Sequence, residues 1–453
     1  MTLRRKLLKL HPAALILTSF LALILIGTLL LSLPVSSKSA PLQVIDALFT
    51  STSAVCVTGL AVVDTGTRFT LFGQIIILVL IQMGGLGVMT LSVLLFRIIG
   101  RKTFYHQRMA VQDMFLHTPQ DDIFKIVKNI IYMTFCIETA GAVLLAIYWS
   151  RTMPVHEAVY TALFHAISAF CNAGFSLFPD SLSTFGDSYL LNFTICMLIV
   201  TGGIGFSVLY EFKNWIKLRK KKRFRFSVQT RTVLLTTAIL IVGGTVWLFI
   251  LERQGILDGK SLAYQFLVAL FQSITCRTAG FNTVDISALN EATIAMMLAL
   301  MFFGASPGSC GGGVKTTTLA LLTATTITRI KRMQRVNLFK KSIPDETVRR
   351  ASTLIIVSVG IIGMVLFMIL SEGAITGRSL GGEFLPYLFE VVSAFGTVGL
   401  SLGVTADLSV WGKFWIVITM IIGRVGILTF SYIIIGTNPT KGFERAEENM
   451  MIG

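Results

Sequence analysis

Long apolar runs separated by short polar stretches dominate the chain. Four runs are clear candidates for membrane-spanning helices, at residues 13–33, 129–149, 232–251 and 352–370. Four more are comparably apolar, at residues 72–96, 189–210, 411–435 and, with a break, 292–328. A helix needs about 20 mostly apolar residues to cross the hydrocarbon core of a bilayer. The pattern therefore predicts an all-α membrane protein with eight spanning helices.

Composition supports this class. Hydrophobic residues make up 54% of the 453 positions and charged residues 14%, which excludes a string of soluble domains. The first apolar run is longer than the roughly 7–15 residues of a secretory signal core, so we expect a spanning helix there rather than a signal peptide. The six cysteines are single, show no metal-ligand spacing and predict no disulfide framework.

The net charge of +16 is distributed unevenly. Most Lys and Arg residues lie before residue 13, in segments 97–128, 213–231 and 329–350, and in the tail. With eight helices threaded in order, all these segments fall on one side of the membrane. The positive-inside rule then puts both termini in the cytoplasm. The basic run 217–225 is accordingly expected to anchor lipid headgroups and set topology rather than bind nucleic acid.

A motif recurs four times along the chain. Leu-Phe begins each copy and Gly ends it, at Phe49 to Gly59, Phe164 to Gly174, Phe271 to Gly280, and Phe389 to Gly399. The offset from Phe to Gly is ten residues in three copies and nine in the third. Each copy lies between two predicted spans. Chance matching at this period is improbable, so the pattern indicates an internal repeat.

Each unit is predicted to contain a helix, a short helix, a Gly-containing extended loop and a second helix. The short segments, at residues 42–54, 155–170, 261–275 and 383–394, are too short to cross a bilayer and are expected to be re-entrant pore helices. Irregular backbone at membrane depth is tolerated where it is buried or lines a wet cavity. Four such loops can converge on one axis and form a pseudo-fourfold central pore. The predicted units are residues 1–105, 106–226, 227–335 and 336–442, followed by a cytoplasmic tail, 443–453.

The second helices of units one, two and four share small residues, in segments 83–87, 201–205 and 423–427. We align these segments on Gly85, Gly203 and Gly426. Small residues there are expected to let the helices pack closely against their neighbours. The third unit differs, because segment 304–318 contains Pro307 and many glycines and cannot remain a regular helix. The segment nearly matches a phosphate-binding P-loop, but Val314 is inserted before Lys315 and no strand precedes it, so no nucleotide site is expected. A packing kink is one interpretation. A gating loop below the filter, built on Gly304, Pro307, Gly308, Gly311, Gly312, Gly313 and Lys315, is the one we favour.

Charged residues inside or beside these segments are functional candidates. Arg424 in the fourth unit is either a fixed cation in the ion path or a structural partner for a carboxylate such as Glu138. Lys315 is expected to hold the loop or to meet lipid headgroups, and Arg277 is expected to point behind its loop. An aspartate follows each loop, at Asp64, Asp180, Asp285 and Asp407. Together they form a cation-attracting outer mouth or, singly, act as turn formers and helix caps.

These loops, the glycine-rich third unit and Arg424 together resemble the Trk/Ktr/HKT potassium transporter superfamily over nearly the whole chain. With no helix pair before the first unit, the chain is most similar to the Ktr system membrane subunit, KtrB. The resemblance implies K⁺ as the transported ion, often with Na⁺ dependence, a bacterial plasma-membrane location, a homodimer, and a cytosolic KtrA-like RCK ring that binds ATP and ADP. Gly59 matches the first filter glycine, where Ser accompanies Na⁺ preference in some members, and so points to K⁺.

The resemblance also implies roles for individual residues. The K⁺ filter, formed mainly by backbone carbonyls, comprises Val57, Thr58, Gly59, Asn172, Ala173, Gly174, Thr278, Ala279, Gly280, Thr397, Val398 and Gly399. Segment 304–318 matches an intramembrane gating loop and Arg424 matches a pore arginine.

Two other classes of function remain as alternatives. An ion-coupled carrier of another solute usually shows broken helices in paired inverted repeats, which four units in the same direction fit poorly. A membrane enzyme would need clustered His, Asp or Glu in the spans, and the sequence has no such cluster.

Overall fold

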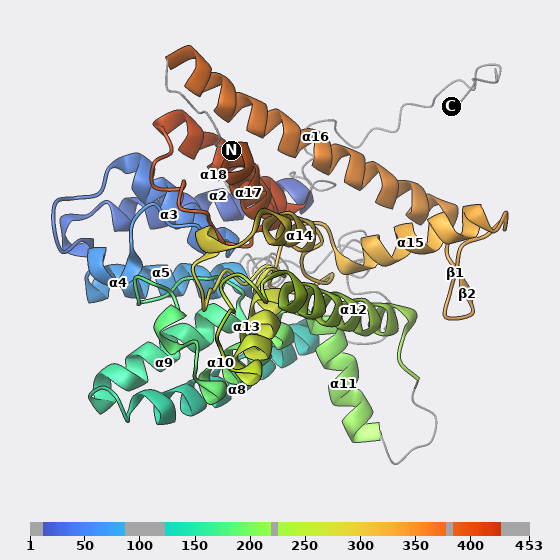
Figure 1. The fold of residues 1–453 in the computed structure, drawn as a ribbon, viewed down its shortest axis with the longest axis horizontal. Helices are drawn as coiled ribbons and strands as arrows, with labels where there is room; N and C mark the ends of the chain where they lie inside the picture. The colour runs from blue at the N-terminus through green and yellow to red at the C-terminus, as the bar shows by residue number, and fades with distance from the viewer. Residues whose placement is uncertain (1–11, 87–122, 219–224, 377–383, 427–453) are drawn as a thin grey trace, which may run out of the picture.

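The structure is a computed structural model that describes residues 12–86, 123–218, 225–376 and 384–426. Its helices follow one order four times: a long helix, a short helix and a further helix or pair of helices (Figure 1). The first set is α2 (Pro12–Leu31), α3 (Val44–Cys56) and α5 (Leu71–Gly85). The second is α8 (Ile123–Trp149), α9 (Val155–Phe170), α10 (Tyr189–Gly203) and α11 (Phe206–Leu218). The third is α12 (Val228–Leu251), α13 (Leu262–Thr275), α14 (Glu291–Phe302) and α15 (Thr316–Ile330), and the fourth is α16 (Asp345–Thr376), α17 (Phe384–Gly396) and α18 (Val410–Val425).

Short elements connect these helices. They are η1 (Pro34–Ser36), α4 (Thr65–Arg68), η2 (Ser183–Phe185), η3 (Ile286–Ala288) and a two-stranded antiparallel hairpin of β1 (Asn337–Leu338) and β2 (Lys341–Ser342), in which Asn337 pairs with Ser342. Hydroxyl side chains start several of the long helices. Ser227 accepts a hydrogen bond from Thr230 N at 3.1 Å at the start of α12, and Ser409 accepts one from Gly412 N at 3.0 Å at the start of α18. Such N-caps satisfy amides that have no partner within the helix.

Three of the described helices are long and apolar enough to cross a membrane: residues 127–149 of α8, α12, and residues 345–373 of α16. The pair α10 and α11 passes the same test together. A mostly helical fold with apolar, membrane-like helices is therefore confirmed. The predicted continuations of two spans, residues 87–96 and 427–435, lie outside the described residues, as do most of segment 97–128 and the tail 443–453.

The predicted unbroken span at 189–210 is wrong. The helix stops at Gly203 and α11 leaves at 100° to α10. Gly205 at the bend has a φ of +96°, a backbone conformation natural to glycine, and Phe206 N donates to Gly308 O at 2.9 Å. The bend thus depends on a contact with the third set of helices, which local sequence does not reveal.

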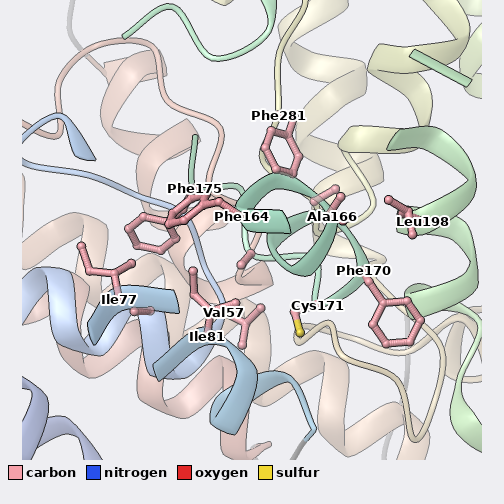
Figure 2. Packing of buried hydrophobic residues seen from close by; sticks show 14 of the residues in the cluster. Val57, Ile77, Ile81, Phe164, Ala166, Phe170, Cys171, Phe175, Leu198 and Phe281 are labelled. Carbon is pink, nitrogen blue, oxygen red and sulfur yellow. The ribbon is translucent and has the colours of Figure 1, made fainter. Parts of the chain in front are cut away.

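The four sets pack in a closed circle. In each set, the helix that follows the loop after the short helix lies against the short helix of the next set: α5 against α9, α10 against α13, α14 against α17, and α18 back against α3. The buried apolar side chains divide into two main clusters, one mainly in the first two sets and one mainly in the last two. Figure 2 shows side chains of the first cluster, among them Phe164, Phe170, Phe175 and Phe281, together with Val57 and Cys171, the residues that directly follow α3 and α9.

Candidate functional site

The loops that follow the four short helices meet at their glycines. A Cβ placed on Gly59 would lie 2.5 Å from Ala173 O, and one on Gly174 would lie 3.0 Å from Ala279 O. The same construction at Gly280 meets Val398 O at 2.5 Å, and at Gly399 it meets Thr58 O at 2.2 Å. Each glycine therefore touches the carbonyl of the next unit, and the fourth touches the first. The four loops form a closed ring, here called the glycine ring (residues 57–59, 172–174, 278–280 and 397–399), in which only glycine fits.

The backbone of the ring repeats a strained conformation. Residues two before each glycine have positive φ, at Val57 (56°), Asn172 (58°), Thr278 (68°) and Thr397 (49°). The glycines themselves have φ between 69° and 93°. Val and Thr rarely adopt the left-handed region, and such residues persist only where the surroundings impose them. The four loops share one unusual backbone path.

The amides between these positions point away from the ring. Thr58 N donates to Ser53 O at 2.8 Å, Ala173 N to Ser168 O at 2.7 Å, Ala279 N to Thr275 O at 3.0 Å, and Val398 N to Ser393 O at 2.8 Å. Each bond ends on the last turn of the preceding short helix. The third loop closes over one residue fewer, which explains its shorter Phe-to-Gly offset. Because the amides are occupied behind the ring, the carbonyls of the same loops are free to face the neighbouring glycines.

Those carbonyls carry the chemistry of the ring. Within the described part of the chain, no hydrogen bond reaches the oxygens of Thr58, Ala173, Ala279 or Val398, although all four residues are buried. Buried carbonyls normally accept a hydrogen bond, so a set that accepts none is a candidate ligand-binding site. Four oxygens converging from four loops match the arrangement that replaces the hydration shell of an alkali cation.

A cavity of about 370 Å³ opens on one side of the glycine ring. All four ring glycines line it, together with Asp64 and Asp285. Asp180 and Asp407 were predicted to share this mouth, but they are not among its lining residues. Each lies next in sequence to a lining residue, Pro179 or Ala406.

Three of these carboxylates also serve local turns. Asp64 accepts from Thr67 N at 2.6 Å, Asp180 from Thr184 N at 3.0 Å, and Asp285 from Ser287 N at 2.9 Å. Capping a turn leaves the charge of each carboxylate in place. The wall of the cavity therefore includes two of the four predicted acidic residues, Asp64 and Asp285.

The segment between α14 and α15, here called the intramembrane loop (residues 303–315), lies against the other side of the ring. Gly312 N donates to the Thr397 hydroxyl at 2.9 Å, and a Cβ on Gly311 would lie 2.0 Å from the Thr278 hydroxyl. The loop closes on itself where Gly304 N donates to Val314 O at 3.0 Å. Gly311 and Gly312 are needed because no side chain fits beneath the ring threonines.

Other helices also hold the intramembrane loop. Ser306 N donates to Gly203 O at 3.0 Å and Cys310 N to Gly202 O at 3.2 Å, both at the end of α10. On the opposite side, Gly313 N donates to Gly423 O of α18 at 3.3 Å. Pro307 meets the bend between α10 and α11, since its carbonyl would lie 2.5 Å from a Cβ on Gly205.

Two cations fasten this loop. Lys315 Nζ donates to Gly311 O at 2.7 Å and Gly312 O at 3.2 Å, which agrees with the expectation that it holds the loop. Arg424 donates to Cys310 O in the loop and to Gly84 O at the end of α5. The alternative partner considered for Arg424, Glu138, instead accepts from Gln82 Nε2 at 3.4 Å. Arg424 therefore links the loop to the first set of helices through backbone carbonyls.

Arg277 follows its prediction. Its side chain is 6% exposed and donates to the Thr237 hydroxyl on α12 at 3.2 Å. The guanidinium thus lies behind the third loop, away from the oxygens of the ring.

The predicted alignment of the second helices needs a correction. A Cβ on Gly84 would lie 2.0 Å from Val55 O, one on Gly202 1.8 Å from Phe170 O, and one on Gly423 2.0 Å from Phe395 O. Each of these carbonyls lies four residues before a ring glycine. Gly423, rather than Gly426, therefore corresponds to Gly84 and Gly202. Arg424 takes the position that Gly85 and Gly203 occupy in the other units.

Sequence reasoning missed the hydroxyl residues behind the ring. Ser53, Ser168, Thr275 and Ser393 supply the carbonyls described above, and their hydroxyls bond the loops as well. Each stands four residues after the Phe of its motif, so the signal is present in the repeat. Serine and threonine also occur at other positions of α3, α9 and α13, so the pattern alone did not single them out.

Comparison with known proteins identifies the family of this chain. The family model described as "TrkH: Cation transport protein" matches residues 10–442. The chain belongs to the TrkH family. Among its relatives, the Ktr system potassium uptake protein B of Vibrio alginolyticus is 39% identical over 430 residues, covering 94% of this chain and 91% of that protein. The potassium/sodium uptake protein NtpJ of Enterococcus hirae is 35% identical over 449 residues, covering 98% of each.

A solved structure confirms the family fold. The crystal structure of the potassium transporter TrkH from Vibrio parahaemolyticus superposes with a TM-score of 0.72 at 22% identity, covering 93% of this chain and 85% of that one. The resemblance to TrkH-family transporters, and to Ktr B proteins in particular, is confirmed.

Proposed function

We propose that this chain is the K⁺-translocating membrane subunit of a bacterial Ktr-type uptake system. In this proposal four units with eight spanning helices surround one central pore, and K⁺ passes inward through the glycine ring. The similarity to Ktr B proteins over more than nine-tenths of the chain supports the choice of system. An inside-negative potential of 100 mV already supplies about 2.3 kcal/mol per cation, so uptake needs no second energy source.

The observation that carries the proposal is the closed ring of buried carbonyls, which have no hydrogen-bond partner among the described residues. The selectivity filter consists of residues 57–59, 172–174, 278–280 and 397–399, with K⁺ held mainly by main-chain oxygens. Asp64 and Asp285 raise the local cation concentration at the outer cavity, and Asp180 and Asp407, each next in sequence to a lining residue, add to the same negative field.

Ion flux through the purified protein in liposomes tests this function. K⁺, Rb⁺ and Na⁺ uptake are compared with and without a sodium gradient, in wild type, Gly59→Ser and Gly399→Ser. A Ser side chain at either position meets a neighbouring carbonyl within 2.5 Å and deforms the ring, so discrimination between K⁺ and Na⁺ should fall. Gly243→Ala is the matched control, because a Cβ there meets nothing within 4 Å. Unchanged discrimination in both Ser variants would contradict the filter.

The intramembrane loop is the gate in this proposal. The loop lies directly beneath the ring threonines and is tied to all four sets of helices, so its position decides whether ions can leave the ring. Arg424 contributes a positive charge at this level, which discourages cations from resting there, and it fastens the closed loop through Cys310 O.

The remaining parts of the proposal concern assembly and coupling. The subunit forms a homodimer in the bacterial plasma membrane with both termini cytoplasmic, and a KtrA-like RCK ring that binds ATP or ADP lies below it. One relative is a potassium/sodium uptake protein, which supports Na⁺ as a second ion. Co-purification with an RCK subunit in each nucleotide, followed by flux with a sodium gradient, tests these points. If no complex with an RCK subunit forms with either nucleotide, the proposed Ktr-type regulation is wrong.

A further inference from the structure

The hydroxyls behind the glycine ring make two different bonds. In the first and fourth units the hydroxyl accepts a hydrogen bond from the ring glycine itself: Gly59 N to Ser53 Oγ at 3.1 Å and Gly399 N to Ser393 Oγ at 3.0 Å. In the second and third units the hydroxyl instead donates to the carbonyl after the glycine: Ser168 Oγ to Phe175 O at 2.8 Å and Thr275 Oγ1 to Phe281 O at 2.6 Å.

The first kind of bond fixes a ring oxygen. A peptide group is planar and trans, so its N–H and C=O point in opposite directions. Gly59 N and Thr58 O belong to the same peptide group. Holding Gly59 N–H on Ser53 therefore aims Thr58 O at the opposite side, where it faces Gly399. Ser393 aims Val398 O toward Gly280 in the same way.

The second kind of bond leaves the ring peptide without that restraint. Phe175 O and Phe281 O belong to peptide groups beyond the glycines, so Ser168 and Thr275 do not hold Ala173 O or Ala279 O through them. Among the described residues, neither Gly174 N nor Gly280 N has a hydrogen-bond partner. The ring thus consists of two peptides fastened by a hydroxyl and two that are not.

We propose that Ser53 and Ser393 are positioning residues for ion discrimination, whereas Ser168 and Thr275 support only the outer ends of their loops. The inference rests on the proposed function of the ring as a filter. A ring whose oxygens stay at fixed positions favours one ion size, because a smaller ion cannot draw the oxygens inward. Without its hydroxyl, the peptide Thr58–Gly59 or Val398–Gly399 can rotate its oxygen out of the ring.

The chain supplies its own controls. Ser51 lies two residues before Ser53 on α3, is equally buried and donates to Ile24 O at 2.8 Å, away from the ring. Ser273 has the same place on α13 and donates to Ile241 O at 2.9 Å. The conservative substitution is Ser→Thr, because unit three already carries Thr275 at this position.

The experiment compares K⁺, Rb⁺ and Na⁺ flux in liposomes for Ser53→Ala, Ser393→Ala, Ser168→Ala, Thr275→Ala and the control Ser51→Ala. The ratio of K⁺ to Na⁺ flux should fall about five-fold in Ser53→Ala and Ser393→Ala, the factor that corresponds to one net hydrogen bond. Ser53→Thr and Ser393→Thr, which keep the hydroxyl, should retain the wild-type ratio of K⁺ to Na⁺ flux. Ser168→Ala, Thr275→Ala and Ser51→Ala should keep the wild-type ratio even where thermal stability falls.

The outcomes separate the two proposals. If Gly59→Ser loses discrimination but Ser53→Ala and Ser393→Ala keep it, the positioning role is wrong and the filter stands. An equal loss of K⁺/Na⁺ discrimination in Ser168→Ala also overturns the positioning role. Removing any hydroxyl behind a loop would then be enough to reduce discrimination. If wild-type protein does not discriminate K⁺ from Na⁺, or if neither Gly59→Ser nor Gly399→Ser changes the discrimination, the filter itself is wrong. A variant that does not fold is replaced by its counterpart in the other unit.

Discussion

At the scale of single residues, backbone carbonyls in the last turn of the short helices leave no room for a side chain at the glycines that face them. Gly84, Gly202 and Gly423 press against carbonyls at the last turn of these helices, which would lie only 1.8 to 2.0 Å from an added Cβ. Real Cβ atoms do not approach oxygen so closely. These glycines therefore set the separation between the second helices and the loops, in the way that small residues allow close helix contact in membranes.

Gly202→Ala should strongly destabilise the protein, whereas Gly243→Ala should not. The added methyl at residue 202 would meet Phe170 O at 1.8 Å, and overpacking of this kind costs typically about 1–3 kcal/mol or more. Residue 243 is helical with open space at its Cβ, so alanine there should stabilise by roughly 0.5–1 kcal/mol. Thermal unfolding in detergent measures both, and similar midpoints for the two variants would contradict the contact.

Thr397→Val should loosen the intramembrane loop without changing the shape of the ring. The substitution keeps the β-branch and removes the oxygen that accepts Gly312 N at 2.9 Å. A buried amide left unsatisfied costs about 1–3 kcal/mol, so the closed arrangement loses population and K⁺ flux should rise several-fold. Thr397→Ser retains the hydroxyl and should behave as wild type in the same flux assay. A rise in the Ser variant alone would count against this bond.

At the scale of elements, the third set differs from the others because its second helix is interrupted by the intramembrane loop. The bend between α10 and α11 belongs to the same device, since Gly205 and Phe206 meet Pro307 and Gly308. Backbone groups freed by the two breaks satisfy one another. A break in one membrane helix is thus compensated by a break in its neighbour.

Deleting residues 308–310, or replacing Arg424 with Ala, should raise basal K⁺ flux. The deletion removes the segment that bonds Gly202 and the bend, and the Arg424 variant removes the link from Cys310 O to Gly84 O. Both changes weaken the closed position of the loop. Flux per folded protein in liposomes is the measurement, with Gly243→Ala as control. Equal or lower flux in well-folded protein would refute the gate.

The sequence predicted the ring and missed two features of the elements. Recurrence of Leu-Phe and Gly identified Gly59, Gly174, Gly280 and Gly399, because each glycine stands at a nearly constant distance in sequence from its Phe. The sequence comparison aligned the second helix of the fourth unit at Gly426, which is wrong. Only the contact of Gly423 with Phe395 O defines the equivalent position. Sequence reasoning missed the bend at Gly205 for a similar reason, since a single glycine is tolerated in a helix unless a distant partner uses it.

At the scale of the whole molecule, the helices pack as a circle in which each set leans on the next. Threaded through a membrane, this order places the ends of α11 and α15 on the side of the basic segments 213–231 and 329–350. The loop between α12 and α13 then lies on the opposite side. From the charge pattern alone, the positive-inside rule predicts that the basic side is the cytoplasmic one.

Cysteine labelling in intact cells should separate the two sides. Lys260→Cys, exposed after α12, should react with a membrane-impermeant maleimide from outside, and Lys331→Cys, exposed after α15, only after permeabilisation. Both are built on Cys136→Ala, which removes the exposed native thiol. Reaction of Lys331→Cys in intact cells would invert the topology.

The closed ring also has a direction, and this has a genetic consequence. Gly59 presses on a carbonyl of the second unit, Gly280 on one of the fourth, and Gly399 on one of the first. A side chain added at one of these glycines therefore displaces the loop of the next unit rather than only its own loop. In a selection for restored growth on low K⁺, second-site suppressors of Gly59→Ser should fall around residues 168–174, and those of Gly399→Ser around residues 53–58. Suppressors that arise only within the mutated loop would mean that the four loops adjust independently.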